Sequence, residues 1–471
     1  MNPVPGNEIS ERRRLPLTGV ASHGERSYPI EVVSARGLAL VVRFLLGSPP
    51  DAPLVFDQVR LALGKESAAL GRCRFEAHGD GIQGSIVPMD AQIRCRDLLL
   101  RRKVVRLDQD FDQLPLLLSR RITIRPEFRA YTADLVYEMA VHRSLFDEID
   151  ASLTSESPES QALLRESILA AQGPAFFRFF DERLKILEEM VRPFTRAEHE
   201  RHGFYFRKSV WGFILTSPFL TRTNLRPRGY SGDSIMMQYL YENTYQGDSL
   251  FGRLMHKHPT SAPAAQAVRN RRRLVVESVR RVYHERQDTA RPLRILSVAC
   301  GPAWEVRDLF ATAEDCARYE YTLLDQDEEA LNEAQQTVEV VGATVGARIT
   351  ARFLRDSVRT MLNTADLSAS LGRHDFIYAM GLFDYLTAPV ARTVLGKLYQ
   401  LLTPGGWMKI GNFHVGNRSR IYMEYWLDWV LHYRSEADLA ALAQELPGAS
   451  YRIFLEETGS QMFLEVRQAA K

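Results

Sequence analysis

The sequence predicts an α/β fold, with a doubly wound sheet in the C-terminal two-fifths of the 471 residues behind a helical region and a small N-terminal β-barrel. Over 16–92 the apolar residues alternate with a period of two, which indicates antiparallel strands. Over 131–286 they recur at helical spacing instead. After Pro292 short strands alternate with helices, which indicates a parallel sheet with helices on both faces.

The N-terminal and middle regions differ in their punctuation as well as their period. Runs such as YPIEVVSARGLALVVRF and GRCRFEAHGDGIQGSIV are separated by glycine and Asp-Gly turns, as in a small antiparallel barrel or sandwich. The segment QALLRESILAAQGPAFFRFFDERLKILEEMVRPF predicts a long helical stretch that ends near Pro193. We therefore expect three domains, over 1–110, 111–290 and 291–471.

The C-terminal region alternates between apolar strands and longer helical segments. Helices are expected over 328–341 and 389–401. The closing runs YRIFLEE and QMFLEV are separated only by TGS and should form a hairpin, so one of them must run antiparallel to its neighbours. The earlier strands are expected near 294–298, 321–325, 348–354, 375–380 and 407–412.

Composition and charge exclude several classes of protein. Hydrophobic residues make up 45% and charged residues 25% of the chain, and the net charge of +2 predicts no general attraction to polyanions or membranes. Four widely spaced cysteines without a CxxC pair argue against a disulfide framework or a metal site. The start MNPVPGNEISERRR lacks the apolar core of a signal peptide, and GLALVVRFLLG is short and interrupted by Arg43. We expect a cytoplasmic protein without a membrane span.

The basic runs of the chain, among them 269–281, are expected to be solvated faces and helix ends. No N/D-P-P-Y/F motif and no sustained basic surface accompany them. A nucleic-acid substrate is therefore the least favoured hypothesis.

The turn after the first strand of the sheet, ACGPA, is rich in small residues around Gly301. In a doubly wound sheet, ligands bind outside the carboxyl ends of the strands, and small residues let the backbone approach a ligand closely. The turn lacks the G-x-G-x-x-G pattern of dinucleotide sites, and a plain strand-to-helix connection would look similar.

Acidic residues follow the next two strands. Asp325 lies 24 positions after Gly301, where a carboxylate can accept hydrogen bonds from ribose hydroxyls. Asp356 follows the third strand and could accept from the amine of an adenine. Each acid has a structural alternative as a helix N-cap, which Asp327 in particular fits. A glycine turn and two acids at three successive strand ends nevertheless favour one shared ligand site.

These motifs resemble those of class I S-adenosylmethionine-dependent methyltransferases. SVACGPA is similar to the first motif of the family, with Ser297 in place of its acid and Ala299 and Ala303 in place of two glycines. Asp325 matches the ribose-binding acid, and Asp356 with the serine after it matches the pair at the adenine edge. A nicotinamide dehydrogenase fits worse, because the glycine fingerprint is absent and it has no need of the closing hairpin.

The resemblance covers the last two-fifths of the chain. HDFIYAMGLFDYL matches the fourth strand and the loop beneath the reactive methyl group, and LLTPGGWMKIGNF matches the turn into the fifth. The resemblance implies a Rossmann-like seven-stranded methyltransferase domain with S-adenosylmethionine as cofactor. The cofactor-binding residues expected from it, together with two from the middle region, are Ala299, Cys300, Gly301, Pro302, Asp325, Gln326, Asp356, Ser357, Met380, Gly381, Tyr230 and Asp233.

Methyl transfer from a sulfonium is an in-line displacement, so the protein mainly orients two reactants. A carboxylate acceptor is already anionic and needs no general base, whereas an alcohol or amine needs a His, Asp or Tyr near the methyl group. The catalytic candidates are His414, Asp384 and Tyr385. His414 could act as a base, orient a carboxylate, or be a satisfied loop histidine. The helically spaced aromatic set over 422–429 is expected to be core packing, with an apolar pocket wall as the alternative.

The middle region holds one distinctive stretch, RPRGYSGD, before helices rich in Met and Tyr. In one interpretation Asp233 and Asp248 are helix N-caps. In the other this stretch is a lid, with Arg228 or Tyr230 near the carboxylate of the cofactor and Asp233 near its ammonium. The stretch resembles a bacterial subgroup that makes 3-hydroxypalmitic acid methyl ester, which implies carboxyl methylation of a 3-hydroxy fatty acid.

The N-terminal runs ERRRLPLTG and EVVSARGLAL resemble a PilZ domain, a small barrel that binds cyclic di-GMP in its active form. Ser34 and Gly37 match its motif, but Val32 occupies the acid position and the arginines are consecutive. These departures argue against cyclic di-GMP binding and favour a barrel that only docks on a neighbour. The main prediction is a methyltransferase acting on a small, acyl or carboxylate acceptor. The alternative is a regulatory cofactor- or nucleotide-binding protein with a catalytically weak methyltransferase fold.

Overall fold

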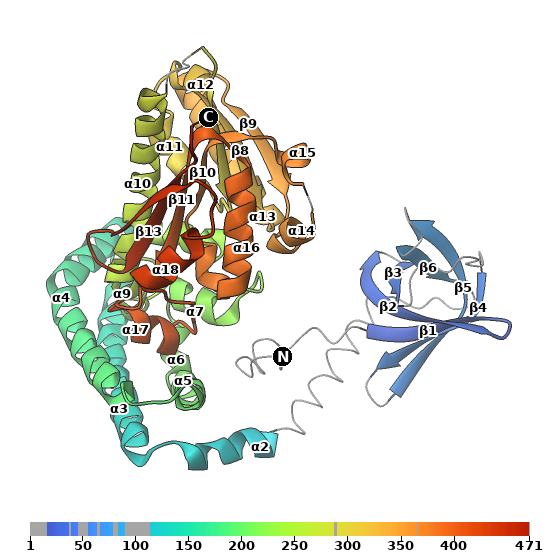
Figure 1. Ribbon diagram of the computed structural model, residues 1–471. Coiled ribbons are helices and arrows are strands. Elements are labelled where there is room, and N and C mark those ends of the chain that lie inside the picture. Colours follow the sequence, from blue (N-terminus) through green and yellow to red (C-terminus); the bar gives the residue numbers. More distant parts are fainter. Residues whose placement is uncertain are drawn as a thin grey trace. The chain divides into compact units, whose positions relative to one another are not determined.

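The computed structural model describes residues 17–36, 39–45, 55–63, 66–78, 83–89, 114–286, 290–364 and 366–470. The chain divides into two compact units, Met1–Ile124 and Arg125–Lys471 (Figure 1). The predicted division into three domains stays a prediction.

The first unit contains the expected β-barrel. Its six strands close in the order β1-β2-β3-β6-β5-β4 with antiparallel pairing throughout. Phe44, Phe56 and Phe75 pack in its interior with ring centroids 5.4–6.3 Å apart. The strands are β1 (Leu17–His23), β2 (Arg26–Arg36), β3 (Ala39–Phe44), β4 (Val55–Leu63), β5 (Glu66–His78) and β6 (Gln83–Pro88), followed by α2 (Leu114–Ser119) and η1 (Arg120–Thr123).

One residue of the barrel, Val32, is relevant to the PilZ resemblance. Val32, in the position of the motif acid, is buried in the aromatic and aliphatic core of the barrel. The arginines 12–14 and Gly37 lie outside the described residues. The resemblance therefore stays a prediction.

The second unit begins with the predicted helical region. Pro193 follows the end of its longest helix, as expected, because proline cannot continue a helix. Ser249 rather than the predicted Asp248 caps one of the later helices, since its hydroxyl accepts from the Gly252 amide at 3.0 Å. The helices are α3 (Pro126–Ser152), η2 (Leu153–Ser155), α4 (Pro158–Val191), α5 (Arg196–Ser209), α6 (Trp211–Ile214), α7 (Pro218–Leu225), α8 (Ser234–Glu242), α9 (Leu250–Ser261) and α10 (Pro263–Glu285).

The remainder of this unit is a seven-stranded sheet in the order β12-β13-β11-β10-β7-β8-β9. The pairs among β7 to β11 are parallel, and β13 is antiparallel to β11 and β12. The expected hairpin and the reversed closing strand are both confirmed. The strands are β7 (Leu293–Val298), β8 (Tyr319–Asp325), β9 (Thr350–Arg355), β10 (His374–Ala379), β11 (Leu402–Phe413), β12 (Ser450–Leu455) and β13 (Gln461–Arg467).

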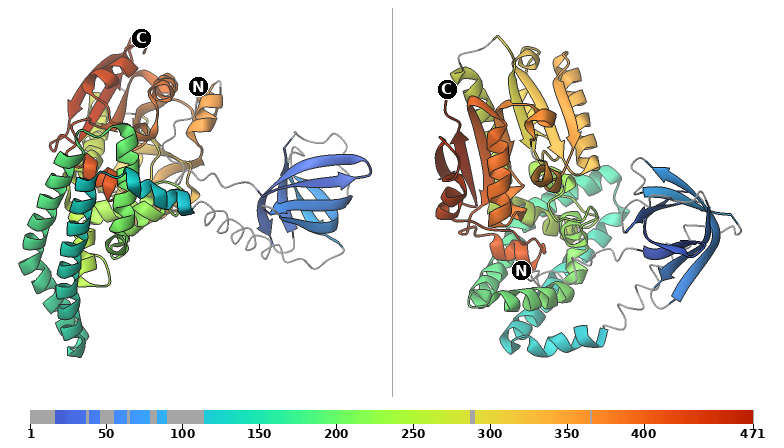
Figure 2. Two further views of the ribbon diagram at one scale, coloured as in Figure 1. Left: turned by 90° about the horizontal axis from the view of Figure 1, so that it is seen from below. Right: turned by 45° about the vertical axis from the view of Figure 1, so that its right-hand side comes forward.

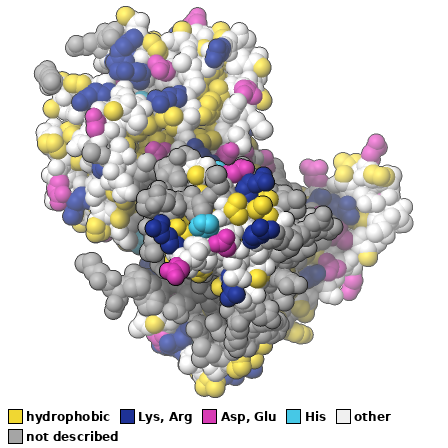
Figure 3. All heavy atoms as spheres, turned by 90° about the vertical axis from the view of Figure 1, so that its right-hand side faces the viewer, with side chains coloured by type: hydrophobic (Ala, Val, Ile, Leu, Met, Phe, Trp, Pro, Cys, Tyr) yellow, Lys and Arg dark blue, Asp and Glu magenta, His cyan; other side chains and the backbone are white. Residues whose placement is uncertain are grey.

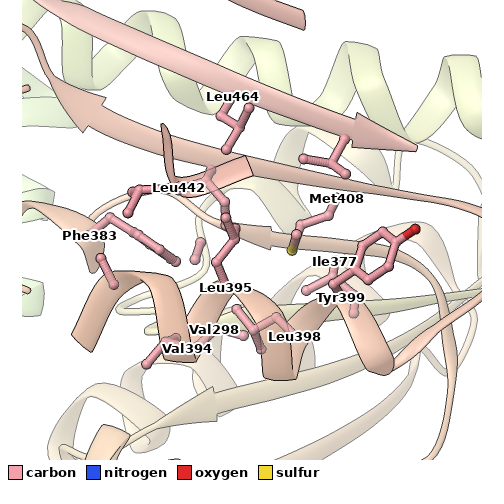
Figure 4. Close-up of a cluster of buried hydrophobic side chains, with 14 of the residues drawn as sticks. Val298, Ile377, Phe383, Val394, Leu395, Leu398, Tyr399, Met408, Leu442 and Leu464 are labelled. Carbon is pink, nitrogen blue, oxygen red and sulfur yellow. The ribbon is translucent and has the colours of Figure 1, made fainter. Parts of the chain in front are cut away.

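Helices cover both faces of this sheet, which a parallel sheet needs because its strands are apolar on both sides (Figure 2). One face carries α14 (Val358–Asn363), α15 (Ser368–Leu371), α16 (Ala388–Gln400) and α18 (Glu436–Ala443), and Figure 4 shows side chains such as Leu395 and Leu398 packed there. The opposite face carries α10, α11 (Glu305–Leu309), α12 (Asp315–Arg318) and α13 (Glu328–Val345).

Two connections bind the helical region to the sheet. Helix α10 supplies Val275, Val279 and Val282 to the same core as the sheet strands. Between β11 and β12, helix α17 (Arg420–Tyr425) and the residues after it pack among α4 and α5, where the Trp426 ring lies 4.9 Å from Phe180 and 5.1 Å from Phe206. The site described below is therefore built by both parts of one compact unit.

Within the described residues, none of the helices combines the length and the apolar character needed to cross a membrane. On the face drawn in Figure 3, basic and acidic side chains are interspersed.

Candidate functional site

The turn after β7 has a left-handed backbone at alternate residues. Ala299, Gly301 and Ala303 have φ values of +54°, +55° and +50°. The two alanines occupy the positions where the sequence departs from the glycines of the family motif, so the turn keeps its shape at a steric cost. A Cβ built on Gly301 would meet no atom within 4 Å, so the backbone there borders open space.

Asp325, the last residue of β8, joins this turn to the next strand. Its carboxylate accepts from the amide of Gly301 at 3.0 Å and from that of Asp327 at 3.0 Å. The side chain is 6% exposed, and burial raises the pKa of its carboxyl group. On the other side, the amide of Asp356 donates to the Asp325 carbonyl at 3.0 Å. The three residues thus lie at adjoining strand ends around one place, as the sequence predicts.

A cavity of about 700 Å³ opens beside these strand ends. Three predicted cofactor residues, Tyr230, Gln326 and Ser357, line it. Ser357 also caps α14, and the Asp356 carboxylate accepts from the Ser357 amide at 2.7 Å. The full lining is Arg228, Tyr230, Gln326, Asp327, Glu328, Glu329, Asn332, Arg355 and Ser357.

The RPRGYSGD segment lies at the edge of this cavity. Tyr230 donates to Asp327 at 3.1 Å. Arg228 forms ion pairs with three acids of the β8–α13 connection and α13, at distances of 2.7–3.2 Å. The segment is therefore held over the end of β8 by the chain's own carboxylates. Asp327 also caps α13, the structural role considered for it.

Asp233, the other predicted cofactor residue of this segment, serves as the N-cap of α8. Its carboxylate accepts from the Met236 amide at 3.1 Å and pairs through both oxygens with Arg222 at 2.9 Å. With a side chain only 1% exposed, it is committed to these partners. This is the structural alternative of the two considered.

The end of β10 faces the turn from the other side, because β7 lies between β10 and β8. The Met380 carbonyl accepts from Arg271 at 3.0 Å and from Gln461 at 3.1 Å. A Cβ on Gly381 would lie 3.3 Å from the Arg271 guanidinium. Met380 and Gly381, both predicted as cofactor residues, are thus contacted by a helix outside the sheet.

Asp384 is 2% exposed and accepts from the Phe413 amide at 2.6 Å. Burial raises the pKa of its carboxyl group to about 6. Arg434 donates to the carbonyls of Phe383 and Leu386 on either side, which fixes the loop. The second catalytic candidate of this loop therefore sits on a rigid support.

That candidate, Tyr385, is 40% exposed, and its hydroxyl accepts from the Trp429 indole at 2.9 Å. A Cβ on Gly232 would lie 2.6 Å from the Trp429 ring and 2.6 Å from the Tyr385 hydroxyl, so the lid segment packs directly against this pair. All four residues of the aromatic set are buried, and Trp429 differs from the others in its contact with Tyr385. Tyr422, Tyr425 and Trp426 are buried among the helices, as the core-packing interpretation predicts.

His414 follows the end of β11, on the far side of β10 from the glycine turn. Its Nδ1 accepts from the Gly416 amide at 3.2 Å, which places the proton on Nε2, and Nε2 faces Glu436 at 3.3 Å. Both ring nitrogens therefore have local partners.

Arg271 is the residue that the sequence analysis missed. The run 269–281 was expected to be solvated, yet Arg271 is 8% exposed. Its position explains the burial, because Val268, Arg271 and Val275 fall on one face of α10 and the two valines are core residues. Helical spacing could therefore have singled it out from the other arginines of the run.

Residues 295–406 match a family described as a methyltransferase domain, and no curated protein matches the chain. A possible exported protein from Bordetella parapertussis is 17% identical, with a TM-score of 0.41 over 67% of this chain and 99% of that chain. Magnesium protoporphyrin IX methyltransferase from Synechocystis PCC 6803, solved with bound SAH, is 14% identical with a TM-score of 0.34 over 44% and 87%. A SAM-dependent methyltransferase from Methanosarcina mazei is 15% identical with a TM-score of 0.30 over 40% and 98%. At these TM-scores the solved structures do not establish the fold of this chain. The fold is assigned from the strand order of the sheet.

The family match agrees with the predicted methyltransferase domain, whose cofactor is S-adenosylmethionine. The residues present fit this group. Gly301 offers an open approach that a side chain would fill, and the Asp325 carboxylate stands beside it.

Proposed function

We propose that the protein is a methyltransferase that transfers a methyl group from S-adenosylmethionine to the carboxylate of a fatty-acid-like small molecule. The observation that carries the proposal is the junction of three strand ends at Asp325, where the Gly301 amide and the Asp356 amide both bond. In a doubly wound sheet this edge is the ligand-binding edge.

The residues of the glycine turn and of β8 hold the adenosyl group in this proposal. Asp325 accepts from the ribose hydroxyls, the Gly301 backbone lies against the ligand, and Asp356 with Ser357 borders the adenine. When bound, S-adenosylmethionine supplies an electrophilic methyl group. Because Asp325 is buried, its hydrogen bonds are electrostatically stronger than they would be in water.

The loop after β10 receives the acceptor. Tyr385 and Trp429 form its wall, and Arg434 holds the loop carbonyls so that the wall keeps its position. Orientation of this kind is the main contribution a protein makes to an in-line displacement.

A carboxylate acceptor suits the residues around this loop. His414 has both ring nitrogens engaged, and Asp384 accepts from a backbone amide, so neither resembles a base awaiting a proton. A carboxylate needs no base, because it is already ionised at neutral pH. We assign His414 an orienting role on the loop.

An apolar tail on the acceptor is supported by exposed apolar side chains near the Tyr385–Trp429 pair. Val430, 66% exposed, follows Trp429 in the chain. Leu225, 58% exposed, precedes Arg226, whose guanidinium pairs with Asp428 at 2.8 Å. The Arg226–Asp428 ion pair joins the two segments that carry these exposed apolar residues, which suits an acceptor with an apolar tail.

The test is methyl transfer by the full chain from labelled S-adenosylmethionine to three acceptors of equal chain length: 3-hydroxypalmitic acid, hexadecanol and hexadecylamine. The proposal predicts label in a base-labile ester of the acid alone. Transfer to the alcohol or amine instead would contradict the acceptor class. Cofactor binding in calorimetry without transfer to any acceptor would favour the regulatory alternative.

A further inference from the structure

Arg271 differs from its neighbours on α10 in the kind of partner it has. Arg272 pairs with Asp308 at 2.6 Å, and Arg273 pairs with Glu457. The hydrogen-bond partners of Arg271 are neutral: the Met380 carbonyl at 3.0 Å, the Met237 sulfur at 3.2 Å and the Tyr241 hydroxyl. Burying a guanidinium without a carboxylate is costly, so the position calls for an explanation.

Two buried acids that interact electrostatically with Arg271 have other hydrogen-bond partners. Glu305, on the helix after the glycine turn, accepts from the Tyr378 hydroxyl at 2.6 Å. Asp384 accepts from the Phe413 amide. Neither forms an ion pair with Arg271 among the residues the structure describes. The guanidinium therefore keeps donors available for an anion from outside the chain.

The position of Arg271, on α10 beside the end of β10, indicates which anion it could bind. Asp325 ends β8 and Arg271 contacts the end of β10, while β7 with its glycine turn lies between them. Neighbouring strands are about 4.8 Å apart, so these two ends are separated by roughly 10 Å. A ligand whose ribose meets Asp325 and which crosses the glycine turn presents its other end to Arg271. In S-adenosylmethionine that end carries the amino-acid carboxylate.

The other arginine considered for this carboxylate is already neutralised. Arg228 pairs with Asp327, Glu329 and Glu333. A ligand carboxylate near it would also meet those three acids, and like charges close together repel. Arg271 has no ion-pair partner in the described part of the chain, and the two acids near it, Glu305 and Asp384, already accept from Tyr378 and the Phe413 amide.

We propose that Arg271 binds the carboxylate of the methionine portion of S-adenosylmethionine and so sets the depth at which the cofactor enters the site. This inference rests on the function proposed above. It assigns a residue of the helical region to cofactor recognition, which would make α10 part of the binding site as well as a cover for the sheet.

The experiment compares two ligands by calorimetry on the full chain. S-adenosylhomocysteine carries the amino-acid carboxylate, whereas 5′-methylthioadenosine shares the adenosine and the thioether but lacks the amino acid. In R271Q we expect the affinity for S-adenosylhomocysteine to fall roughly 10- to 100-fold, the worth of a charge-assisted hydrogen bond, with R271K intermediate. The affinity for 5′-methylthioadenosine should change by less than about threefold, which also shows that the variant is folded.

The matched control is R273Q, which removes an equal charge from the exposed side of the same helix. It should leave both affinities within about twofold of wild type. Equal losses for both ligands in R271Q, or an unchanged affinity for S-adenosylhomocysteine, would overturn the inference while the proposed function stands. Failure of the wild-type protein to bind either ligand would overturn both.

Discussion

Replacing Asp325 with asparagine separates its two roles, joining the strand ends and binding the cofactor. The carboxylate receives two backbone hydrogen bonds at 3.0 Å, each worth about 1.5–3 kcal/mol when charge-assisted. Asparagine keeps one acceptor oxygen and loses the other. Because burial raises the pKa of Asp325, ionisation at neutral pH already costs the folded state some stability, and the neutral amide removes that cost.

We therefore expect D325N to lower the free energy of unfolding by no more than about 2 kcal/mol, while D325A, which leaves both amides unsatisfied, lowers it by about 2–5 kcal/mol. In both variants the affinity for S-adenosylmethionine should fall at least about tenfold, because the charged carboxylate that accepts from the ribose hydroxyls is replaced by a neutral amide or removed. Urea denaturation and calorimetry measure the two effects.

Asp315 provides the matched control. Its carboxylate also accepts from two backbone amides at 3.0 Å, those of Ala311 and Thr312, but at the start of helix α12, before β8 begins. D315N should show a similar loss of stability with unchanged cofactor affinity. An unchanged affinity in D325N as well would refute the ribose-binding role.

Three further outcomes are expected. Burial raises the pKa of Asp384 from 3.8 to about 6, so its carboxyl group destabilises the fold as the pH rises through that interval. Relative to D384N, the wild-type protein should lose about 2 kcal/mol of unfolding free energy between pH 3.8 and pH 6 in urea denaturation, and a constant difference would contradict the burial. Ala299→Gly should leave the free energy of unfolding unchanged or raise it by up to about 1 kcal/mol, because the left-handed backbone strains alanine. Ala171→Gly, at an exposed position of α4, should lower it by about 1 kcal/mol. Equal losses in the two variants would argue against the strain. His414→Ala should keep turnover within about tenfold of wild type, because a general base contributes roughly 100-fold or more, and a larger loss would make His414 a base.

The sheet could be predicted because each of its strands is recognisable from its local sequence. Apolar runs such as Leu293–Val298 end in small or acidic residues, and the strand order then places Gly301, Asp325 and Asp356 at one edge. The closing hairpin was equally plain, since three residues leave no room for a crossover between two strands.

The contributions of the helical region to the site were less predictable. Arg271 lies in a run of arginines, and only its phase with Val268 and Val275 distinguishes it from its exposed neighbours. The sequence allowed two interpretations of Asp233, a helix N-cap and a cofactor contact. Its ion-pair partner, Arg222, lies on a different helix, so the local sequence could not distinguish them. Such contacts depend on how α7, α8 and α10 pack, which local sequence does not encode.

The site residues in the loop after β10 show the same limit. Asp384 was predicted from its motif, but its rigid setting depends on Arg434, which lies 50 residues away and bonds the carbonyls of the loop. The close packing of Gly232 against Tyr385 and Trp429 likewise joins three distant segments. Long-range packing of this kind appears only in the folded chain.

The most direct test of the account is a crystal structure of the full chain with S-adenosylhomocysteine. The account predicts the ribose hydroxyls on the Asp325 carboxylate, the adenine beside Asp356 and Ser357, and the backbone of Gly301 against the ligand. Ligand density in a different part of the molecule, or a ribose turned away from Asp325, would contradict it.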